Sequence, residues 1–119
     1  MGRSAAIYCE TTVGAGLPVL GTLSDLVRTG DHVNAIDGVL SGTLSFVLDQ
    51  LRAGVKFSDA VRDAHARGFS EPDPRDDLMG ADVGRKLLIL AREAGYPLEP
   101  SAVTITPMEI GRASCRERV

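Results

Sequence analysis

The sequence predicts an α+β fold in which helices cover one face of a mixed β-sheet. Three observations support this prediction: short alternating apolar runs, longer segments with apolar residues three and four apart, and Gly or Pro residues between them. Strands are expected at Ala6–Thr12, Val33–Leu40 and Ala102–Thr106. With four helices between the first and last strand, the expected element order is βαβαααβ.

Each expected helix is bounded by residue types that cap or break helices. The helices are expected at Leu17–Arg28 before Gly30, at Leu44–Leu51 between the Ser41-Gly42-Thr43 cap and Gly54, from a Ser58 cap to Arg67 before Gly68, and from near Asp73 to Glu93 before Gly95.

The segment from Phe69 to Lys86, the acidic run, contains most of the residues that could perform chemistry. It reads FSEPDPRDDLMGADVGRK and places five carboxylates before one lysine. Pro72 and Pro74 forbid a helix through its first part. Asp73 followed by Pro74 suits an N-cap and a first helical residue, so the long helix is expected to begin there.

Spacing alone leaves two interpretations of these polar residues open. Asp82 and Lys86 are four residues apart and share a helical face, whereas Asp77 lies about 140° around the same helix from Asp82. In one interpretation, the acidic residues complement the helix dipole and Asp82 forms a surface ion pair with Lys86, worth about 0.3–0.5 kcal/mol. In the other, these side chains line a substrate pocket.

Four segments resemble homoserine dehydrogenase, in the order in which that family has them. They are the acidic run with its Glu-Pro-Asp-Pro-Arg-Asp-Asp signature, CETTVGAGLPVLGTL at Cys9–Leu23, RTGDHV at Arg28–Val33 and IDGVLSGTLSFVL at Ile36–Leu48. The resemblance extends from about Ala6 to Pro107. It implies an NAD(P)-dependent oxidoreductase that interconverts L-homoserine and L-aspartate 4-semialdehyde in threonine, methionine and isoleucine biosynthesis.

The resemblance also implies a role for each polar residue of the acidic run. Glu71 and Asp77 match substrate-binding positions, where carboxylates can bind the ammonium group of homoserine. Asp82 and Lys86 match catalytic positions at the reacting hydroxyl, with Lys86 transferring the proton. An unperturbed lysine is a poor base near neutral pH. The family supplies a second active-site lysine from its nucleotide domain, which this chain does not contain.

Three further positions are compared with the family. Gly42 and Thr43 match positions beside the substrate, although helix capping explains the same residues equally well. Phe69 departs from the family, which usually has tyrosine there, so a hydroxyl contact with the substrate is expected to be lost.

The Gly-rich turn at Val13–Pro18 does not match a nucleotide-binding loop. It lacks both the third glycine of Gly-x-Gly-x-x-Gly and the lysine of a phosphate loop, so no cofactor-binding residue is assigned in this chain. By resemblance the turn is a monovalent cation site, for an ion such as Na+. Its implied oxygen ligands are the Glu10 carboxylate and the carbonyls of Val13, Ala15 and Leu17. A tight turn that needs glycine for its backbone is the alternative.

The resemblance implies an incomplete homoserine dehydrogenase catalytic domain. Residues 1–108 are expected to be a fragment of the substrate-binding and dimerisation domain, without the Rossmann domain. The fragment is expected to be inactive alone and to form a homodimer in the full-length protein. Residues 109–119, EIGRASCRERV, do not resemble the family. Reverse translated, they resemble a sequencing-library adapter, so this tail is expected to be non-native.

Composition argues against several classes of partner. The net charge of −3 and the aromatic content of 4% do not favour nucleic acid or an anionic membrane as a partner. No apolar stretch has the length of a membrane span, and no signal peptide is visible. Cys9 and Cys115 form neither a disulfide framework nor a metal site, so a cytoplasmic protein is expected. The alternative function is a stand-alone, non-catalytic module for amino-acid binding or dimerisation.

Overall fold

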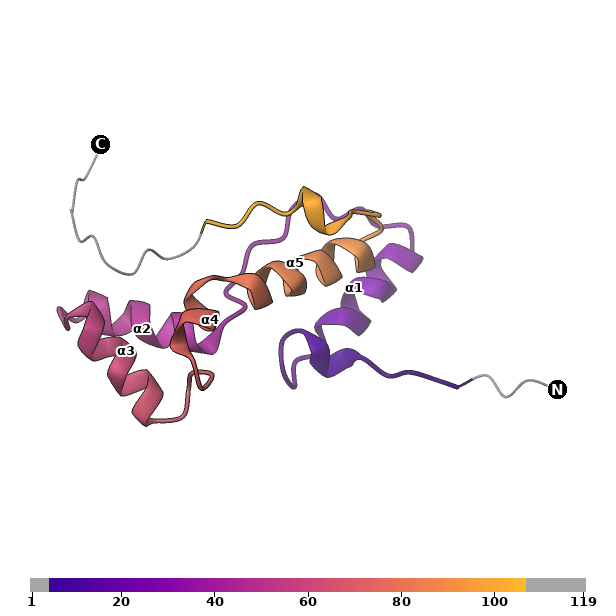
Figure 1. Cartoon of the computed structure of the whole chain (residues 1–119). Coiled ribbons are helices and arrows are strands. Elements are labelled where there is room, and N and C mark those ends of the chain that lie inside the picture. The colour runs from indigo at the N-terminus through magenta and orange to yellow at the C-terminus, as the bar shows by residue number, and fades with distance from the viewer. Residues whose placement is uncertain (1–4, 107–119) are drawn as a thin grey trace, which may run out of the picture. The chain divides into compact units, whose positions relative to one another are not determined.

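A computed structural model of the chain describes residues 5–106, and this part is helical (Figure 1). The helices are α1 (Val19–Arg28), α2 (Gly42–Arg52), α3 (Phe57–Ala66), α4 (Pro74–Leu78) and α5 (Ala81–Glu93), with short 3-10 turns η1 (Glu10–Thr12) and η2 (Pro100–Ala102). None of these helices is long and apolar enough to cross a membrane. The tail at 109–119 lies outside the described residues.

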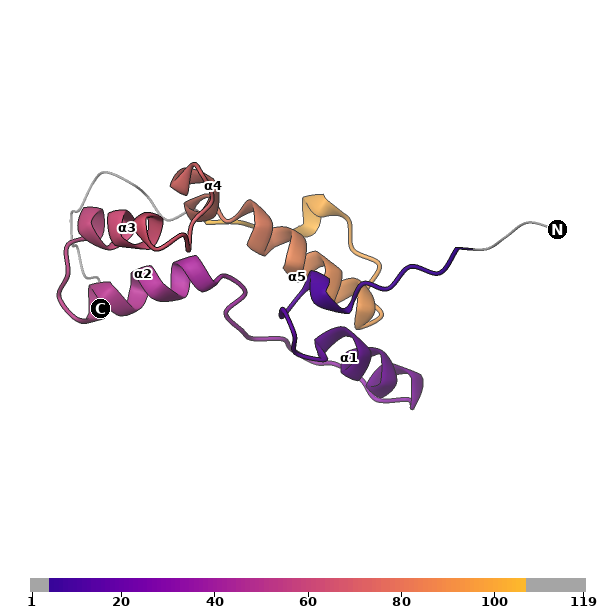
Figure 2. The ribbon, with the colours of Figure 1, turned by 90° about the horizontal axis from the view of Figure 1, so that it is seen from below.

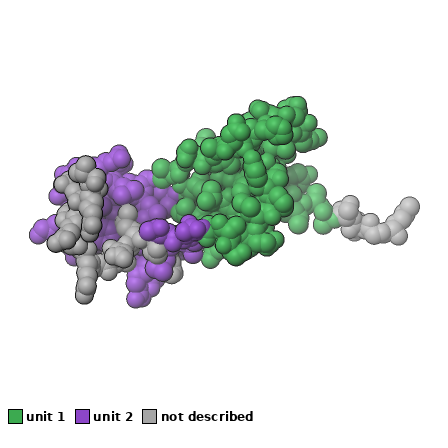
Figure 3. All heavy atoms as spheres, turned by 90° about the horizontal axis from the view of Figure 1, so that it is seen from above, with its two compact units in different colours: residues 1–40, 83–103 green, residues 41–82, 104–119 purple. Residues whose placement is uncertain are grey.

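The chain divides into two compact units, which Figure 3 shows in different colours. The first unit comprises residues 1–40 and 83–103 and contains α1 and most of α5. The second comprises residues 41–82 and 104–119 and contains α2, α3 and α4. Each unit buries its own apolar cluster.

The core of the first unit joins the Gly-rich turn to α1 and α5. Val13, Leu20 and Leu90 are almost fully buried there, and partly buried side chains pack around them. Val13 is only 1% exposed, which explains why the turn before α1 folds back over this helix. Burial of these apolar side chains stabilises this unit through the hydrophobic effect.

The core of the second unit is the contact between α2 and α3. The two helices lie side by side in both views of the ribbon (Figures 1 and 2). Val47, Ala60 and Ala64 are each no more than 1% exposed. The two alanines are small, so the backbone of α3 can approach Val47 closely. Ser41 caps α2, because its Oγ accepts a hydrogen bond of 3.2 Å from the N–H of Leu44.

The expected α+β sheet is wrong: residues 5–106 contain helices and turns and no β-strand. Of the three expected strands, Ala6–Thr12 ends in the turn η1 and Ala102–Thr106 begins at the end of η2. Ile7 and Tyr8 are 88% and 94% exposed. Alternating apolar residues predict which face of a strand is buried, but a strand also needs a neighbouring backbone with which to form a ladder.

The third expected strand, Val33–Leu40, is extended but bonds to side chains at both ends. Tyr96 Oη donates to the carbonyl of Val33 at 2.7 Å, and Lys86 Nζ donates to the carbonyl of Leu40 at 3.1 Å. Side-chain donors from α5 and the turn after it therefore satisfy the two end carbonyls of this segment, which a neighbouring strand could bond in a sheet.

The helices expected before residue 70 are present, with shifted ends. The helix expected from Leu17 starts at Val19, and α2 extends beyond the expected Leu44–Leu51 on both sides. The Ser58 cap is wrong, because α3 already begins at Phe57 with Lys56 in the N-cap position.

The single long helix expected from Asp73 to Glu93 is also wrong, because it is two helices. Met79 ends α4 and Gly80 has a positive φ of 72°, a conformation that glycine adopts without steric cost. A Cβ at Gly80 would lie 3.2 Å from Ile105 Cγ2. Asp77 is therefore on α4, and Asp82 and Lys86 are on α5.

Replacing Val47 with Ala should lower the free energy of unfolding of the second unit by about 2 kcal/mol, because it leaves a cavity against Ala60 and Ala64. Leu48→Ala is the matched control on the same helix. Leu48 is 42% exposed, so its truncation should cost less than about 1 kcal/mol. Urea unfolding measures both, and equal losses for the two variants would contradict the assigned core.

Candidate functional site

The acidic loop, defined here as Phe69–Asp73, connects α3 to α4 and carries Glu71. The backbone N–H of Glu71 donates a hydrogen bond of 2.9 Å to Asp77 Oδ2. This bond joins the backbone of Glu71 to the side chain of Asp77, the other predicted ammonium ligand. Glu71 is exposed and Asp77 is half-buried, so the Glu71 carboxylate can reach a solute directly.

Asp73 starts α4 as expected and makes two kinds of bond with Arg75. Its Oδ1 accepts from the backbone N–H of Arg75 at 3.0 Å, and its Oδ2 accepts from Arg75 Nη2 at 2.6 Å. The side-chain bond, followed by the backbone bond, lowers the pKa of Asp73 from 3.8 to about 2. The Asp73 carboxylate therefore caps the helix and is not assigned a substrate contact.

Thr43 lies in the first turn of α2 and reaches the acidic loop. Its hydroxyl donates a hydrogen bond to the carbonyl of Phe69, and only 8% of Thr43 is exposed. Gly42, the other residue predicted beside the substrate, is the first residue of α2 and is exposed. The structure thus gives Thr43 a protein partner and leaves Gly42 at the surface.

Phe69 packs against α2 through an aromatic pair. Its ring meets the ring of Phe46 edge-on, with centroids 5.2 Å apart and planes at 70°. The guanidinium of Arg67 lies over the Phe46 ring at 5.3 Å. Where the resembling family has a tyrosine, this chain therefore has an apolar side chain that holds the loop against α2.

Asp82 and Lys86 lie one turn apart on α5. Asp82 is exposed in the first turn and Lys86 is half-buried. The shared helical face expected from their spacing is confirmed by the helix that contains both residues. Lys86 is anchored in the first unit, because its ammonium group donates to the carbonyl of Leu40 at 3.1 Å.

Glu10, the predicted carboxylate ligand of a cation, caps α1. Its Oε1 accepts from the N–H of Leu20 at 3.0 Å and its Oε2 accepts from the N–H of Gly21 at 2.8 Å. A carboxylate at a helix N-terminus is favoured by the helix dipole. Each carboxylate oxygen has two lone pairs, so the cap leaves acceptor capacity for a cation.

The three predicted carbonyl ligands belong to the strained turn before α1. Val13 has a buried side chain, Ala15 has a φ of 52° and the carbonyl of Leu17 accepts from the N–H of Val19 at 2.8 Å. A positive φ in a residue other than glycine is uncommon. The donor set of one carboxylate and three carbonyls fits a hard monovalent ion in its chemistry.

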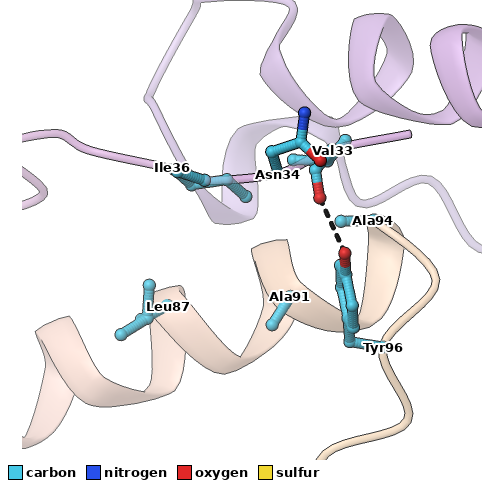
Figure 4. A pocket seen from close by; sticks show the side chains of 8 residues that line it. Val33, Asn34, Ile36, Leu87, Ala91, Ala94 and Tyr96 are labelled. Carbon is cyan, nitrogen blue, oxygen red and sulfur yellow. Dashed lines mark hydrogen bonds between the residues drawn. The ribbon is translucent and has the colours of Figure 1, made fainter. Parts of the chain in front are cut away.

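A separate cavity of about 170 Å³ lies between α5 and the extended segment (Figure 4). Its lining is mainly apolar, and Tyr96 stands at one end with its hydroxyl directed at the Val33 carbonyl. None of the site residues predicted from the sequence lines this cavity.

The sequence did not indicate the residues that hold the acidic loop and the lysine. The Phe46–Phe69 pair and the carbonyl of Leu40 join positions 23 and 46 residues apart along the chain. An aromatic residue on the buried side of α2 was the only local signal. Helical periodicity explains such a residue as core, so it does not identify the loop that it contacts.

Comparisons with known proteins agree on one family. A family model described as homoserine dehydrogenase matches residues 18–117. The bifunctional aspartokinase/homoserine dehydrogenase of Buchnera aphidicola is 52% identical over 99 residues, which cover 83% of this chain and 12% of that protein. The homoserine dehydrogenase of Emericella nidulans is 54% identical over 100 residues, which cover 80% of this chain and 27% of that protein.

One solved structure adds a similarity in three dimensions. The crystal structure of a Candida auris protein of unknown function matches with a TM-score of 0.73 and 53% identity, over 78% of this chain and 27% of that chain. The chain therefore spans less than a third of the length of each of these relatives.

The contribution of Asp73 to the stability of α4 should depend on pH. Because its folded pKa is depressed, this contribution is present above about pH 3.8 and is lost as the pH falls towards 2. An NMR titration of the side-chain carboxyl carbon should give a midpoint near 2, and Arg75→Gln should return it towards 3.8. A midpoint that does not move in Arg75→Gln would show that Arg75 is not the cause.

Proposed function

Because the chain belongs to the homoserine dehydrogenase family, we propose that it supplies the homoserine-binding part of an enzyme that interconverts L-homoserine and L-aspartate 4-semialdehyde. The observation that supports the proposal is the hydrogen bond from the Glu71 N–H to Asp77 Oδ2, which joins the backbone of one predicted ammonium ligand to the side chain of the other. Since the chain spans less than a third of the relatives it matches, the complete activity is proposed for a longer protein.

Glu71 and Asp77 are proposed to bind the ammonium group of homoserine. The exposed carboxylate of Glu71 accepts a charge-assisted hydrogen bond from the substrate. Asp77 uses Oδ2 to hold the backbone of Glu71 and offers Oδ1 to the same ammonium group. Two carboxylates suit one cationic group because the positive charge of the ammonium stabilises the ionised form of both carboxylates.

Lys86 and Asp82 are proposed to act at the reacting hydroxyl. In reduction of the aldehyde, the ammonium of Lys86 donates a proton to the carbonyl oxygen as the alcohol forms. In the reverse direction, Lys86 receives the hydroxyl proton. Its bond to the Leu40 carbonyl fixes the direction of the side chain, as proton transfer requires. Asp82, one turn earlier on α5, orients the same hydroxyl.

The proposal assigns residues of this chain to the monovalent cation but none to the nicotinamide cofactor. NAD(P) would supply the hydride chemistry in the longer protein, and no residue of this chain is assigned to its binding. The cation is proposed to bind at Glu10 and the carbonyls of Val13, Ala15 and Leu17, because the cap on α1 holds the Glu10 carboxylate in place while each of its oxygens keeps a further lone pair. Its contribution would be structural.

Activity can be tested in a chimera of the Emericella nidulans enzyme that carries the matching residues of this chain. In it, Glu71→Gln should raise the KM for homoserine by about 10- to 100-fold, the value of one charge-assisted hydrogen bond. Glu99→Gln is the matched control, because Glu99 is exposed and lies outside the acidic loop. An unchanged KM in Glu71→Gln would rule out the ammonium contact.

Lys86→Met in the same chimera should lower kcat by about 10²- to 10⁴-fold, the usual contribution of a proton-transfer residue. Its affinity for the nicotinamide cofactor should stay as in the unmodified chimera. Lys56→Met, at the exposed start of α3, should leave both quantities unchanged. Steady-state kinetics and cofactor titration measure them, and near-normal turnover of Lys86→Met would exclude the proton-transfer role.

A further inference from the structure

Three consecutive residues of the acidic loop are held by side chains from three different helices. Thr43 of α2 donates to the Phe69 carbonyl, His65 of α3 lies 3.1 Å from Ser70 Oγ through Nδ1, and Asp77 of α4 accepts from the Glu71 N–H at 2.9 Å. In addition, the N–H of Phe69 donates to the carbonyl of Ala64 at 3.0 Å. The loop backbone is thus bonded at Phe69 and Glu71, and Ser70 between them is held through its side chain, while the Glu71 carboxylate is exposed.

Thr43 differs from the other two holding residues because it belongs to the core. It is 8% exposed, and Val47, one turn later on the same helix, is 1% exposed and packs against α3. Asp77 is half-buried and His65 is exposed. The Thr43 hydroxyl is therefore the anchor whose position is set by the packing of α2.

The direction of the Thr43 bond limits what else this hydroxyl can do. A threonine hydroxyl has one proton to donate, and Thr43 gives it to the Phe69 carbonyl. In this state Thr43 cannot donate a hydrogen bond to a substrate carboxylate. Its chemistry favours a role in shaping the loop over a direct contact with an amino acid.

We propose that Thr43 is a positioning residue, which fixes the Phe69–Glu71 backbone from α2 so that the Glu71 carboxylate is in place before an amino-acid ammonium group arrives. The identity of the ligand in this inference rests on the proposed function. The fixed loop rests only on the contacts described above. A loop that is ordered beforehand loses less conformational entropy on binding, so the substrate binds more tightly.

Amide hydrogen exchange of the chain itself tests the fixed loop. Thr43→Val keeps the shape of the side chain and removes the hydroxyl, so the Glu71 amide should exchange about tenfold faster. Thr43→Ser keeps the hydroxyl and should restore slow exchange. Ser45→Ala is the matched control, since it removes a hydroxyl–carbonyl bond within α2 that does not involve the loop. Equal exchange at Glu71 in Thr43→Val and the unmodified chain would overturn the inference.

A second measurement uses the unmodified chain, so it tests the inference even if the Thr43→Val protein fails to fold. In the unmodified chain, the Thr43 hydroxyl proton should exchange slowly enough to be observed by NMR, with a cross-peak to Phe69. A hydroxyl proton that exchanges too fast to be seen would overturn the inference. In Thr43→Val, unchanged protection at Val47 and Ala64 shows that the α2–α3 core is intact.

The chimera tests the consequence for binding. Thr43→Val should raise the KM for homoserine about fivefold at unchanged kcat, and Thr43→Ser should return the KM to its original value. A KM that does not change, or one that Thr43→Ser does not restore, would overturn the positioning role. A chimera with the unmodified segment that binds no homoserine would instead overturn the proposed function, and the exchange measurement would still decide whether Thr43 fixes the loop.

Discussion

The left-handed turn at Gly80 is the constraint on which the arrangement of the acidic run depends. Gly80 has a φ of 72° and its N–H donates to the carbonyl of Asp77 at 3.3 Å, which closes α4 after a little more than one turn. In a continuous helix the direction of the Asp77 side chain would be fixed at about 140° around the helix axis from that of Asp82. Asp77, on the short helix before the break, accepts a hydrogen bond from the backbone N–H of Glu71.

A few contacts connect the core of the second unit to the acidic loop. Val47 and the alanines of α3 hold α2 and α3 together, and Thr43 and Phe46 extend from α2 to Phe69. Each contact is modest in energy, because one hydrogen bond contributes about 1 kcal/mol and an aromatic pair a similar amount. Together they leave Glu71 as an exposed carboxylate on a fixed backbone.

Local chemistry was predictable from the sequence, whereas long-range contacts were not. The Asp73-Pro74 start of α4 and the Ser41 cap of α2 depend on neighbouring residues, and both predictions are confirmed. The sheet was wrong because alternation along Val33–Leu40 does not reveal whether another strand lies beside it. The break at Gly80 was missed because apolar spacing continues across it, and a single glycine is compatible with a helix.

In the candidate site too, the residues were predictable from the sequence but their long-range contacts were not. The identity of its residues followed from a family resemblance, and the family is now shown by the comparisons. The roles of those residues in substrate binding and catalysis stay predictions. Glu10 and Thr43 illustrate what sequence alone could not provide, since their partners Leu20 and Phe69 are 10 and 26 residues away. Only the folded chain shows that one carboxylate caps α1 and one hydroxyl holds the acidic loop.

The Gly80 break itself is the most direct point at which to test this description of the site. Backbone ¹³Cα chemical shifts of the 119-residue chain should be helical over Pro74–Leu78 and Ala81–Glu93, with an interruption at Gly80 and couplings that indicate a positive φ there. Uninterrupted helical shifts from Pro74 to Glu93 would contradict it, because Asp77 would then be fixed on the same helix as Asp82 and Lys86.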